Sequence, residues 1–413
     1  MILKRQYWRL RSVFNEYPRH FWTLLVATFI DRVGGAILFP FFTLYITQKF
    51  GVGMTTVGMI FGTFAVTGMV GSTIGGALAD RLGRKPLILF GLVISAVSSI
   101  WLGLVNEIEL FFAGAIFVGL FTNIGGPARQ AMIADILPEE QRAQGFAIFR
   151  VVANLAVAIG PAIGGFLASR SYLSLFITDA TISIFVAILL FLILPETRIA
   201  SKSKDKESMG QTFGGYGTVL RDGFFMFFWV ASALSAMIYI QMNGTLAVYL
   251  RDTHSVSLQG FGAIMSLNAS MVVLFQFSIT RRYAKYPELA VITVGALLNA
   301  IGFALYGFVA TYGLFLVAMA IITIGEMLWA PISQSIVARL APDDMRGRYM
   351  AFYGFSWAIP FAIGPLLAGL VIDNYDPNWV WYAGGLFGLI SAAMFGVIYV
   401  RSTRKEIVAA TTD

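Results

Sequence analysis

Long apolar runs separated by short polar turns extend along almost the whole chain. A helix needs about 20 apolar residues to cross the hydrocarbon core of a bilayer, and each run reaches roughly that length. The pattern therefore predicts an all-α integral membrane protein with twelve transmembrane helices. They are expected at residues 21–47, 55–79, 86–105, 110–132, 143–169, 172–195, 223–250, 258–280, 288–310, 313–338, 346–373 and 378–400.

The longest polar segment divides these runs into two groups of six. It includes the run 201–208, which is too polar to form a packed core. We therefore predict five parts of the chain: a cytoplasmic N-terminal segment at 1–20, a first six-helix bundle at 21–195, a cytoplasmic linker at 196–222, a second six-helix bundle at 223–400 and a cytoplasmic tail at 401–413.

The two groups repeat each other in sequence. At one constant offset, Pro127 matches Pro331 and Arg142 matches Arg346, and several Gly residues match as well. Apolar helices resemble one another by chance, but shared Pro, Arg and Gly residues at a single offset argue against chance. The sequence therefore predicts two pseudo-symmetric bundles, an arrangement in which substrates bind near the bilayer midplane between the repeats.

Composition agrees with a lipid environment and argues against several functional classes. Charged residues make up 12% of the 413 residues and hydrophobic residues 58%, whereas a soluble domain carries about 25% charged residues. The chain has no Cys and two His, so disulfides and thiol catalysis are excluded and a metal site is not expected. The sequence has no phosphate-binding loop of an ATP-driven pump and no cluster of catalytic side chains. We expect neither an enzyme nor a bound cofactor.

The basic residues predict the orientation of the chain. With the N-terminus inside, most Lys and Arg residues fall in inner segments, and the outer loops hold only Lys49, Arg170 and Arg251. By the positive-inside rule, both termini are expected in the cytoplasm and the protein in the cell (inner) membrane. Because the net charge of +7 lies in these loops, it does not indicate a nucleic-acid partner.

The charged turn after the second run is the most specific motif. Residues 76–86 read Gly-Ala-Leu-Ala-Asp-Arg-Leu-Gly-Arg-Lys-Pro. This stretch resembles the signature loop of the major facilitator superfamily almost position for position, and the resemblance covers essentially the whole chain. It implies the major facilitator fold and a secondary transporter that works as a monomer. It also implies a cytoplasmic gating network that forms in one state and breaks in the other, at Gly76, Asp80, Arg81, Gly83, Arg84 and Asp135.

Two contacts are implied within that network. In the family, the Asp of the loop meets the dipole of a helix in the other half, and the Arg pairs with an acid at the end of the fourth span. The matching residues here are Asp80, Arg84 and Asp135.

A second motif lies in the fifth run. Its members Gly160, Pro161, Gly164 and Gly165 are similar to the antiporter signature of the superfamily, which is associated with export. Pro removes a backbone hydrogen bond and allows a kink, and Gly residues let two helices approach closely.

Ionisable residues inside the runs are few and are functional candidates for that reason. The resemblance implies that the first, fourth, seventh and tenth spans line the central cavity, which favours Asp31 and Glu326 as proton-coupling residues. A carboxyl group in an apolar cavity can exchange a proton while substrate competes for its charged form. The alternative for Asp31 is a static salt bridge with Arg32 or Arg150, and Asp179 is expected to be a rim or packing residue.

Polar and aromatic residues on the same spans are the expected substrate-cavity residues. One departure from the family concerns the fourth run, where drug:proton antiporters usually carry an Arg. Here Arg129 lies only near the inner end, so Arg32 or Arg150 is expected to supply the cation. The full set of cavity candidates is Arg32, Asn123, Arg150, Tyr239, Gln241, Asn243, Trp329 and Trp357.

The sequence therefore favours alternating-access transport, with proton-coupled efflux of small lipophilic or cationic compounds as the leading function. Its expected partners are a small-molecule substrate, protons and the lipid bilayer. The alternatives on the same fold are a lipid or glycolipid flippase and a sugar or metabolite exporter. A sensor or scaffold without transport is disfavoured by the intact gating loop.

Overall fold

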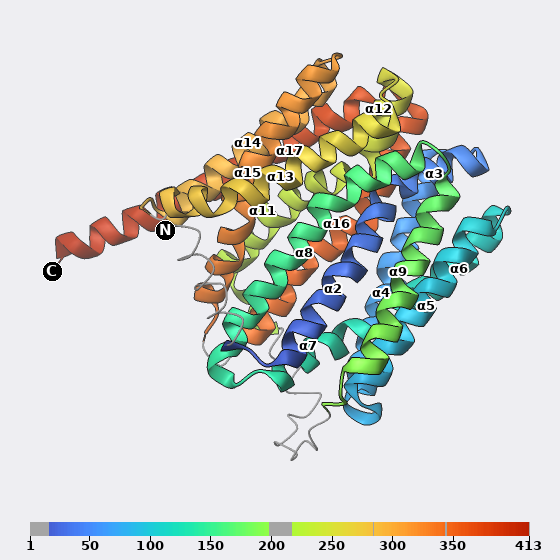
Figure 1. The fold of residues 1–413 in the computed structure, drawn as a ribbon. Coiled ribbons are helices and arrows are strands. Elements are labelled where there is room, and N and C mark those ends of the chain that lie inside the picture. The colour runs from blue at the N-terminus through green and yellow to red at the C-terminus, as the bar shows by residue number, and fades with distance from the viewer. Residues whose placement is uncertain (1–15, 198–216, 284, 343–344, 413) are drawn as a thin grey trace, which may run out of the picture. The chain divides into compact units, whose positions relative to one another are not determined.

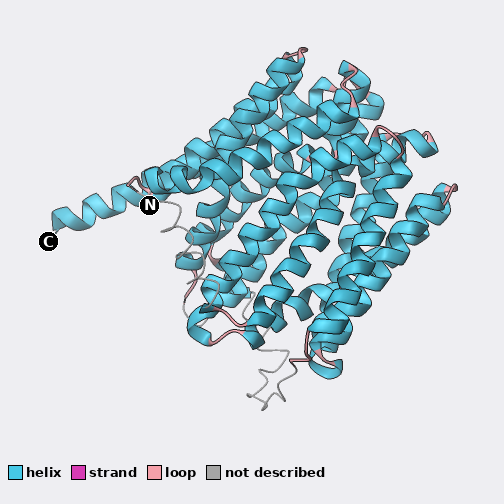
Figure 2. Cartoon of the chain, viewed as in Figure 1, coloured by secondary structure: helices cyan, strands magenta, loops and turns pink. Residues whose placement is uncertain are grey.

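The protein is helical throughout the part of the chain that the computed structural model describes, residues 16–197, 217–283, 285–342 and 345–412 (Figure 1). No strand occurs in these residues (Figure 2). They contain 12 segments long and apolar enough to cross a membrane, which confirms the predicted all-α membrane architecture. The segments are Arg19–Phe50, Met54–Gly75, Arg84–Leu104, Ile108–Ile136, Gln144–Ala168, Tyr172–Ile193, Gly223–Met242, Leu258–Tyr283, Glu288–Phe308, Tyr312–Val337, Arg348–Asn374 and Asn378–Ser402.

The helices follow one another with short connections. Those before the polar linker are α2 (Arg19–Leu38), α3 (Phe42–Phe50), α4 (Met54–Leu82), α5 (Arg84–Leu104), α6 (Ile108–Thr122), α7 (Gly125–Ile136), α8 (Glu139–Ala168) and α9 (Tyr172–Ile193). Those after it are α11 (Gly223–Tyr239), α12 (Thr245–His254), α13 (Leu258–Tyr283), α14 (Glu288–Phe308), α15 (Tyr312–Leu340), α16 (Arg346–Asn374) and α17 (Asn378–Thr412).

Three of the predicted spans are interrupted rather than continuous. The first contains the 3₁₀ turn η1 (Phe39–Phe41), where Pro40 has no N–H to donate to the α-helical ladder. The predicted spans 110–132 and 223–250 divide as well, between α6 and α7 and at the 3₁₀ turn η2 (Ile240–Met242). Such breaks re-aim the side chains that follow them, because the helix resumes with a new phase and direction.

The chain packs into two compact units. One comprises Met1–Phe41 and Thr63–Lys202, and the other comprises Phe42–Gly62 and Ser203–Asp413. Residues 42–62, which we had placed in the first bundle, thus pack with the second half of the sequence. The predicted division into bundles at 21–195 and 223–400 stays a prediction for the chain as a whole.

Each unit has its own apolar core. In the first, α2 packs on α8 and α9, and α5 packs on α7 and α9, around side chains that include Phe21, Leu24 and Met132. In the second, α14 packs on α15 and α17, and α11 packs on α16 and α17, around Phe228 and Phe395 among others.

Large apolar side chains also remain on the outside of both units. Leu192 is 72% exposed and Phe277 is 71% exposed, and many others behave similarly. Patches of this kind are unfavourable in water but match the hydrocarbon interior of a bilayer, where the helix satisfies its own backbone groups.

Candidate functional site

The turn between α4 and α5 is built around Gly83. Gly83 has φ of 102°, a backbone conformation that favours glycine. A Cβ atom at this position would also lie 2.6 Å from a carboxylate oxygen of Glu196. The backbone conformation thus favours glycine, any larger residue would also displace the Glu196 carboxylate, and Gly83 lets α5 begin directly after α4 ends.

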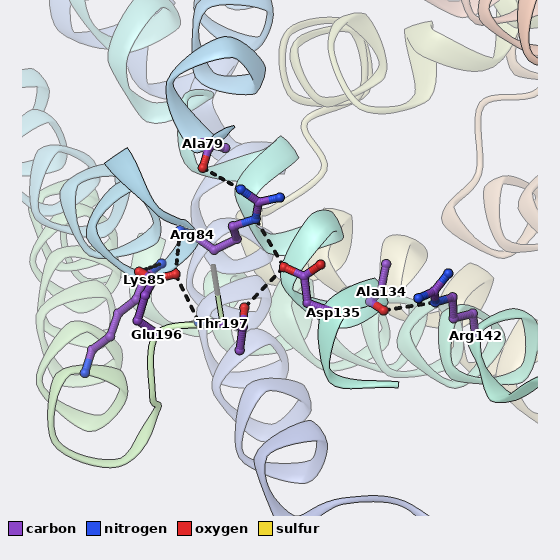
Figure 3. Close-up of polar contacts among 8 residues, drawn as sticks. All are labelled: Ala79, Arg84, Lys85, Ala134, Asp135, Arg142, Glu196 and Thr197. Atoms are coloured by element: carbon purple, nitrogen blue, oxygen red, sulfur yellow. Dashed lines mark hydrogen bonds and ion pairs between the residues drawn. The ribbon is translucent and has the colours of Figure 1, made fainter. Parts of the chain in front are cut away.

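Arg84 lies at the centre of the contacts around this turn. Its Nε atom is 3.2 Å from Oδ2 of Asp135, and its Nη1 atom donates to the carbonyl of Ala79 at 2.7 Å (Figure 3). Both side chains of the ion pair are largely buried, at 12% and 17% exposure. The structure thus brings together the two residues that the family resemblance implied, and their role in gating stays a prediction.

Glu196 completes the turn and was missed by the sequence analysis. Its carboxylate accepts the backbone N–H of Arg84 at 2.9 Å and that of Lys85 at 3.1 Å. These N–H groups open α5 and have no partner within the helix, so an acid here caps them and complements the helix dipole. The signal was an acid directly after the sixth span, which we had assigned to the linker.

Asp135 and the end of α7 make further contacts. Thr197 donates to its Oδ2 atom at 3.4 Å, and Arg142 donates to the carbonyl of Ala134 at 2.9 Å (Figure 3). The end of α7 is therefore fixed from two directions.

The remaining residues of the predicted gating network are Arg81, Gly76 and Asp80. Arg81 is exposed in the last turn of α4. The side-chain environments of Gly76 and Asp80 lie outside the described residues, so the implied contact of Asp80 with a helix of the other half stays a prediction.

The motif Gly160, Pro161, Gly164 and Gly165 places α8 directly against α2. A Cβ atom on Gly160 would lie 2.4 Å from Cβ of Ala36, and one on Gly164 would lie 2.4 Å from the carbonyl oxygen of Ile37. No larger residue fits at either position without displacing α2. The two helices therefore meet closely just before α2 gives way to the turn η1.

Asp31 forms an ion pair with Arg129. The distance from Arg129 Nη1 to Asp31 Oδ2 is 2.9 Å, and the two side chains are 14% and 19% exposed. The alternative we considered for Asp31 was an ion pair with Arg32 or Arg150, whereas the pair in the structure is with Arg129. Arg32 is exposed, and the side chain of Arg150 lies outside the described residues. The break between α6 and α7 places Arg129 against α2. We had predicted a continuous fourth span, so this position was not expected.

Glu326 has a different environment. Its Oε2 atom accepts a hydrogen bond from the amide of Asn268 at 2.8 Å, and the same amide nitrogen lies 3.0 Å from Oγ1 of Thr323. The Tyr239 hydroxyl interacts with the same carboxylate. Within the described residues, no basic side chain forms an ion pair with Glu326, so only neutral groups hold this acid.

Three aromatic rings surround the same region of the second unit. The ring centroids of Trp329 and Trp357 are 5.3 Å apart, and Tyr239 lies 6.3 Å and 5.8 Å from them. Trp329 is fully buried, and its Nε1–H group has no hydrogen-bond partner among the described residues. Aromatic faces next to a carboxylate form an environment that attracts organic cations.

The other cavity candidates are held by local contacts. Gln241 accepts from Thr245 at 2.6 Å and donates to the carbonyl of Met237 at 3.1 Å. Asn123 is exposed and donates to the carbonyl of Gly119 at 3.1 Å, and Asn243 follows the turn η2. Their roles in substrate binding stay predictions.

Asp179 is a further buried acid. It is 6% exposed and hydrogen-bonds to Ser99 of α5. A Cβ atom on Gly34 of α2 would lie 2.8 Å from its Oδ1 atom. Asp179 thus lies where α9, α5 and α2 meet.

Comparisons with known proteins add the wider context. A family model described as Major Facilitator Superfamily matches residues 24–361 and 285–412. A Na(+), Li(+), K(+)/H(+) antiporter of Planococcus maritimus is 29% identical over 413 aligned residues, which cover 92% of this chain and 96% of that protein. The multidrug resistance protein MdtH of Shigella flexneri is 23% identical over 381 residues, which cover 90% of this chain and 92% of that protein.

Solved structures share the fold. A POT family transporter in complex with 5-aminolevulinic acid superposes with a TM-score of 0.78 at 18% identity, covering 92% of this chain and 96% of that one. The nucleoside transporter NupG gives a TM-score of 0.78 at 15% identity, covering 92% and 100%. At these identities the likeness concerns the fold alone.

Proposed function

The chain belongs to the major facilitator superfamily and is a multi-pass membrane transporter, not an enzyme, and we propose that it exports small lipophilic or cationic compounds in exchange for protons. The observation that carries the proposal is the environment of Glu326. This acid lies within a candidate transmembrane span, its partners among the described residues are neutral, and one of them, Tyr239, belongs to a cluster of three aromatic rings.

An uncompensated carboxylate at membrane depth costs several kcal/mol. Either a proton or a bound cation removes that cost. If only one of them can occupy Glu326 at a time, a substrate cation and a proton exclude each other, and this exclusion is the physical basis of antiport. The aromatic rings of Trp329 and Trp357 add affinity for a lipophilic cation through their faces.

Two further observations support export by antiport. The close packing of Gly160 and Gly164 on α2 gives a structural role to the motif that resembles the antiporter signature. The names of the relatives, a cation/proton antiporter and a multidrug resistance protein, point the same way. Both proteins are less than 30% identical to this chain, so their substrates carry over only as part of the proposal.

Asp31 is the second coupling candidate, on different terms. Its charge is already balanced by Arg129, so protonation of Asp31 would release Arg129 rather than remove an uncompensated charge. Asp31 would then act by switching an ion pair, whereas Glu326 would act by taking up a proton or a cation directly.

A second candidate function is exchange of a small inorganic cation for protons. The 29% identical relative is named as such an antiporter, and the carboxylate and hydroxyl oxygens of Glu326 and Thr323 are ligands that hard cations accept. This alternative uses the same acid, so one experiment can separate the two.

The test is transport in proteoliposomes with an imposed pH gradient. A lipophilic fluorescent cation should move in the direction opposite to protons, and Glu326→Gln should reduce that movement to the level of empty liposomes. Glu288→Gln is the matched control, because Glu288 is an acid of the same half that pairs with Arg339 at the end of a span.

The possible outcomes distinguish the two candidate functions and test the role of Glu326. Movement of Na⁺ or K⁺ but not of the organic cation would favour inorganic cation exchange. Full activity of Glu326→Gln together with a preserved pH dependence would contradict the proposed role of Glu326. Asp31→Asn, measured in parallel, shows which of the two acids couples transport to protons.

A further inference from the structure

Residues 42–62 bind to residues that come 204 to 319 positions later in the chain. The carboxylate of Asp373, at the end of α16, accepts the backbone N–H of Met54 at 2.8 Å and that of Thr55 at 2.7 Å. Each carboxylate oxygen takes one N–H group. Because α4 begins at Met54, these are two of the N–H groups that the helix itself leaves without a partner.

The backbones of α4 and α16 are in direct contact beside this carboxylate. A Cβ atom on Gly58 would lie 2.3 Å from Cα of Leu366, and one on Gly369 would lie 2.4 Å from the backbone of Met54. Two glycines, one from each helix, therefore make the contact possible. Adding a methyl group to either would force the helices apart.

A second contact holds α3 in the same unit. Arg251, at the end of α12, donates to the carbonyl of Leu44 at 3.3 Å and to the hydroxyl of Thr47 at 3.1 Å. The segment 42–62 is thus held at both of its helices, by one basic and one acidic side chain of the second half.

Asp373 is suited to a contact that opens and closes. Asp373 is exposed, so water can replace both of its hydrogen bonds when the contact breaks. A carboxylate at a helix N-terminus contributes a modest energy, typically about 0.3–1 kcal/mol, and a contact of that size can be reversed within a transport cycle.

We propose that Asp373 is a conformational latch on the side of the membrane opposite the Gly83 turn. Bound to the N-terminus of α4, it keeps residues 42–62 packed on α12 and α16 and holds that side closed. Its release lets the segment leave the second unit, and that side opens. The inference rests on the proposed alternating access and does not depend on which compound is carried.

The test measures a distance and needs no substrate. The natural chain has no Cys, so Gln48→Cys and Trp379→Cys can carry the only two spin labels; both native residues are exposed. The distance distribution between the labels is recorded by pulsed electron paramagnetic resonance in proteoliposomes. Asp373→Asn should raise the ratio of separated to packed molecules about two- to fivefold, as expected for loss of a charge at a helix N-terminus.

Asp376→Asn is the matched control. It removes the same charge three residues later, where Asp376 accepts the N–H of Asn378, and Asn caps a helix about as well as Asp. Its distance distribution should match that of the unsubstituted labelled protein. If Asp373→Asn behaves like Asp376→Asn, the latch is refuted.

Two further variants keep the test decisive. Thr55→Pro removes one donor without touching Asp373, since Pro is tolerated in the first turn of a helix; if Asp373→Asn does not fold, Thr55→Pro should still shift the distribution in the same direction. Gly58→Ala should separate the segment through steric overlap. A shift in Gly58→Ala but in neither of the other two would show that packing alone holds the segment, and would overturn the role of Asp373.

Discussion

Asp31 and Glu326 are both acids inside candidate membrane spans, one in each half of the sequence, yet their surroundings are opposite. Asp31 faces the cation of Arg129 at 2.9 Å, whereas Glu326 is held by the neutral amide of Asn268 at 2.8 Å. The difference between the two acids therefore lies in the side chains around them and not in the acids themselves. Asp31 joins α2 to α7 through its ion pair with Arg129, whereas Glu326 is the acid for which we propose exchange of a proton for a cation.

The largest expected effect comes from removing the cation of the Asp31 pair. Arg129→Met leaves the carboxylate of Asp31, which is 19% exposed, without its partner, and breaking a fully buried pair, the upper limit here, costs about 3–5 kcal/mol. We expect a marked fall in the unfolding temperature of the detergent-solubilised protein. The double variant Asp31→Asn with Arg129→Met should recover most of the lost unfolding temperature. If Arg129→Met alone is as stable as wild type, the charge of Asp31 does not depend on Arg129, and the contrast with Glu326 is wrong.

The next effect is a difference between two like substitutions. Asp31→Asn removes a charge-assisted hydrogen bond and leaves Arg129 unpaired, so it should lower the free energy of unfolding by about 1.5–3 kcal/mol. Glu326→Gln keeps the shape of the side chain and removes an uncompensated charge, so the stability should be unchanged or higher. Thermal unfolding in one detergent measures both. If the two variants lose the same free energy of unfolding, the charge of Glu326 is compensated in the folded protein to the same extent as that of Asp31.

A smaller effect should follow from the amide that holds Glu326. Asn268→Leu removes its donor to Glu326 and Thr323, which should cost about 1–2 kcal/mol because a buried polar group loses its partner. In the Glu326→Gln background the same substitution should cost less. A double-mutant cycle measures this coupling, and additive losses would mean that the two side chains act independently.

The smallest effect concerns the third buried acid. Ser99→Ala removes the hydroxyl partner of Asp179 and should cost about 1 kcal/mol, whereas Ser98→Ala, at a buried neighbour, is the control. If Ser99→Ala abolishes pH-dependent transport while the protein stays folded, Asp179 joins the coupling candidates and the contrast between two acids becomes one among three.

Local sequence patterns predicted the transmembrane spans and one of the turns between them. All twelve spans were visible because apolar length is a property of each segment alone. The Gly83 turn was predicted from the residues of one motif, and the pair of Arg84 with Asp135 was implied by the family resemblance. These features depend on short stretches or on a resemblance that preserves their spacing.

The parts that could not be predicted depend on breaks and on distant partners. The turn between α6 and α7 decides where Arg129 points, and a hydropathy pattern does not show it. The capping role of Glu196 was not predicted because the sequence does not show that Glu196 lies next to the start of α5, more than 100 residues earlier. The packing of residues 42–62 with the second half required the contact of Met54 with Asp373, which no periodicity encodes. Asn268 could have been found, since a polar amide within an apolar span needs a partner.

The same long-range contact sets an order of events during synthesis. Met54 and Asp373 are 319 residues apart, and a ribosome adds about 5–20 residues per second. The start of α4 therefore enters the membrane on the order of 15–60 s before the helix that receives it has been made. During that interval Gly58, whose neighbour Leu366 has not yet been made, faces lipid or neighbouring chains, so the start of α4 is open to mispairing.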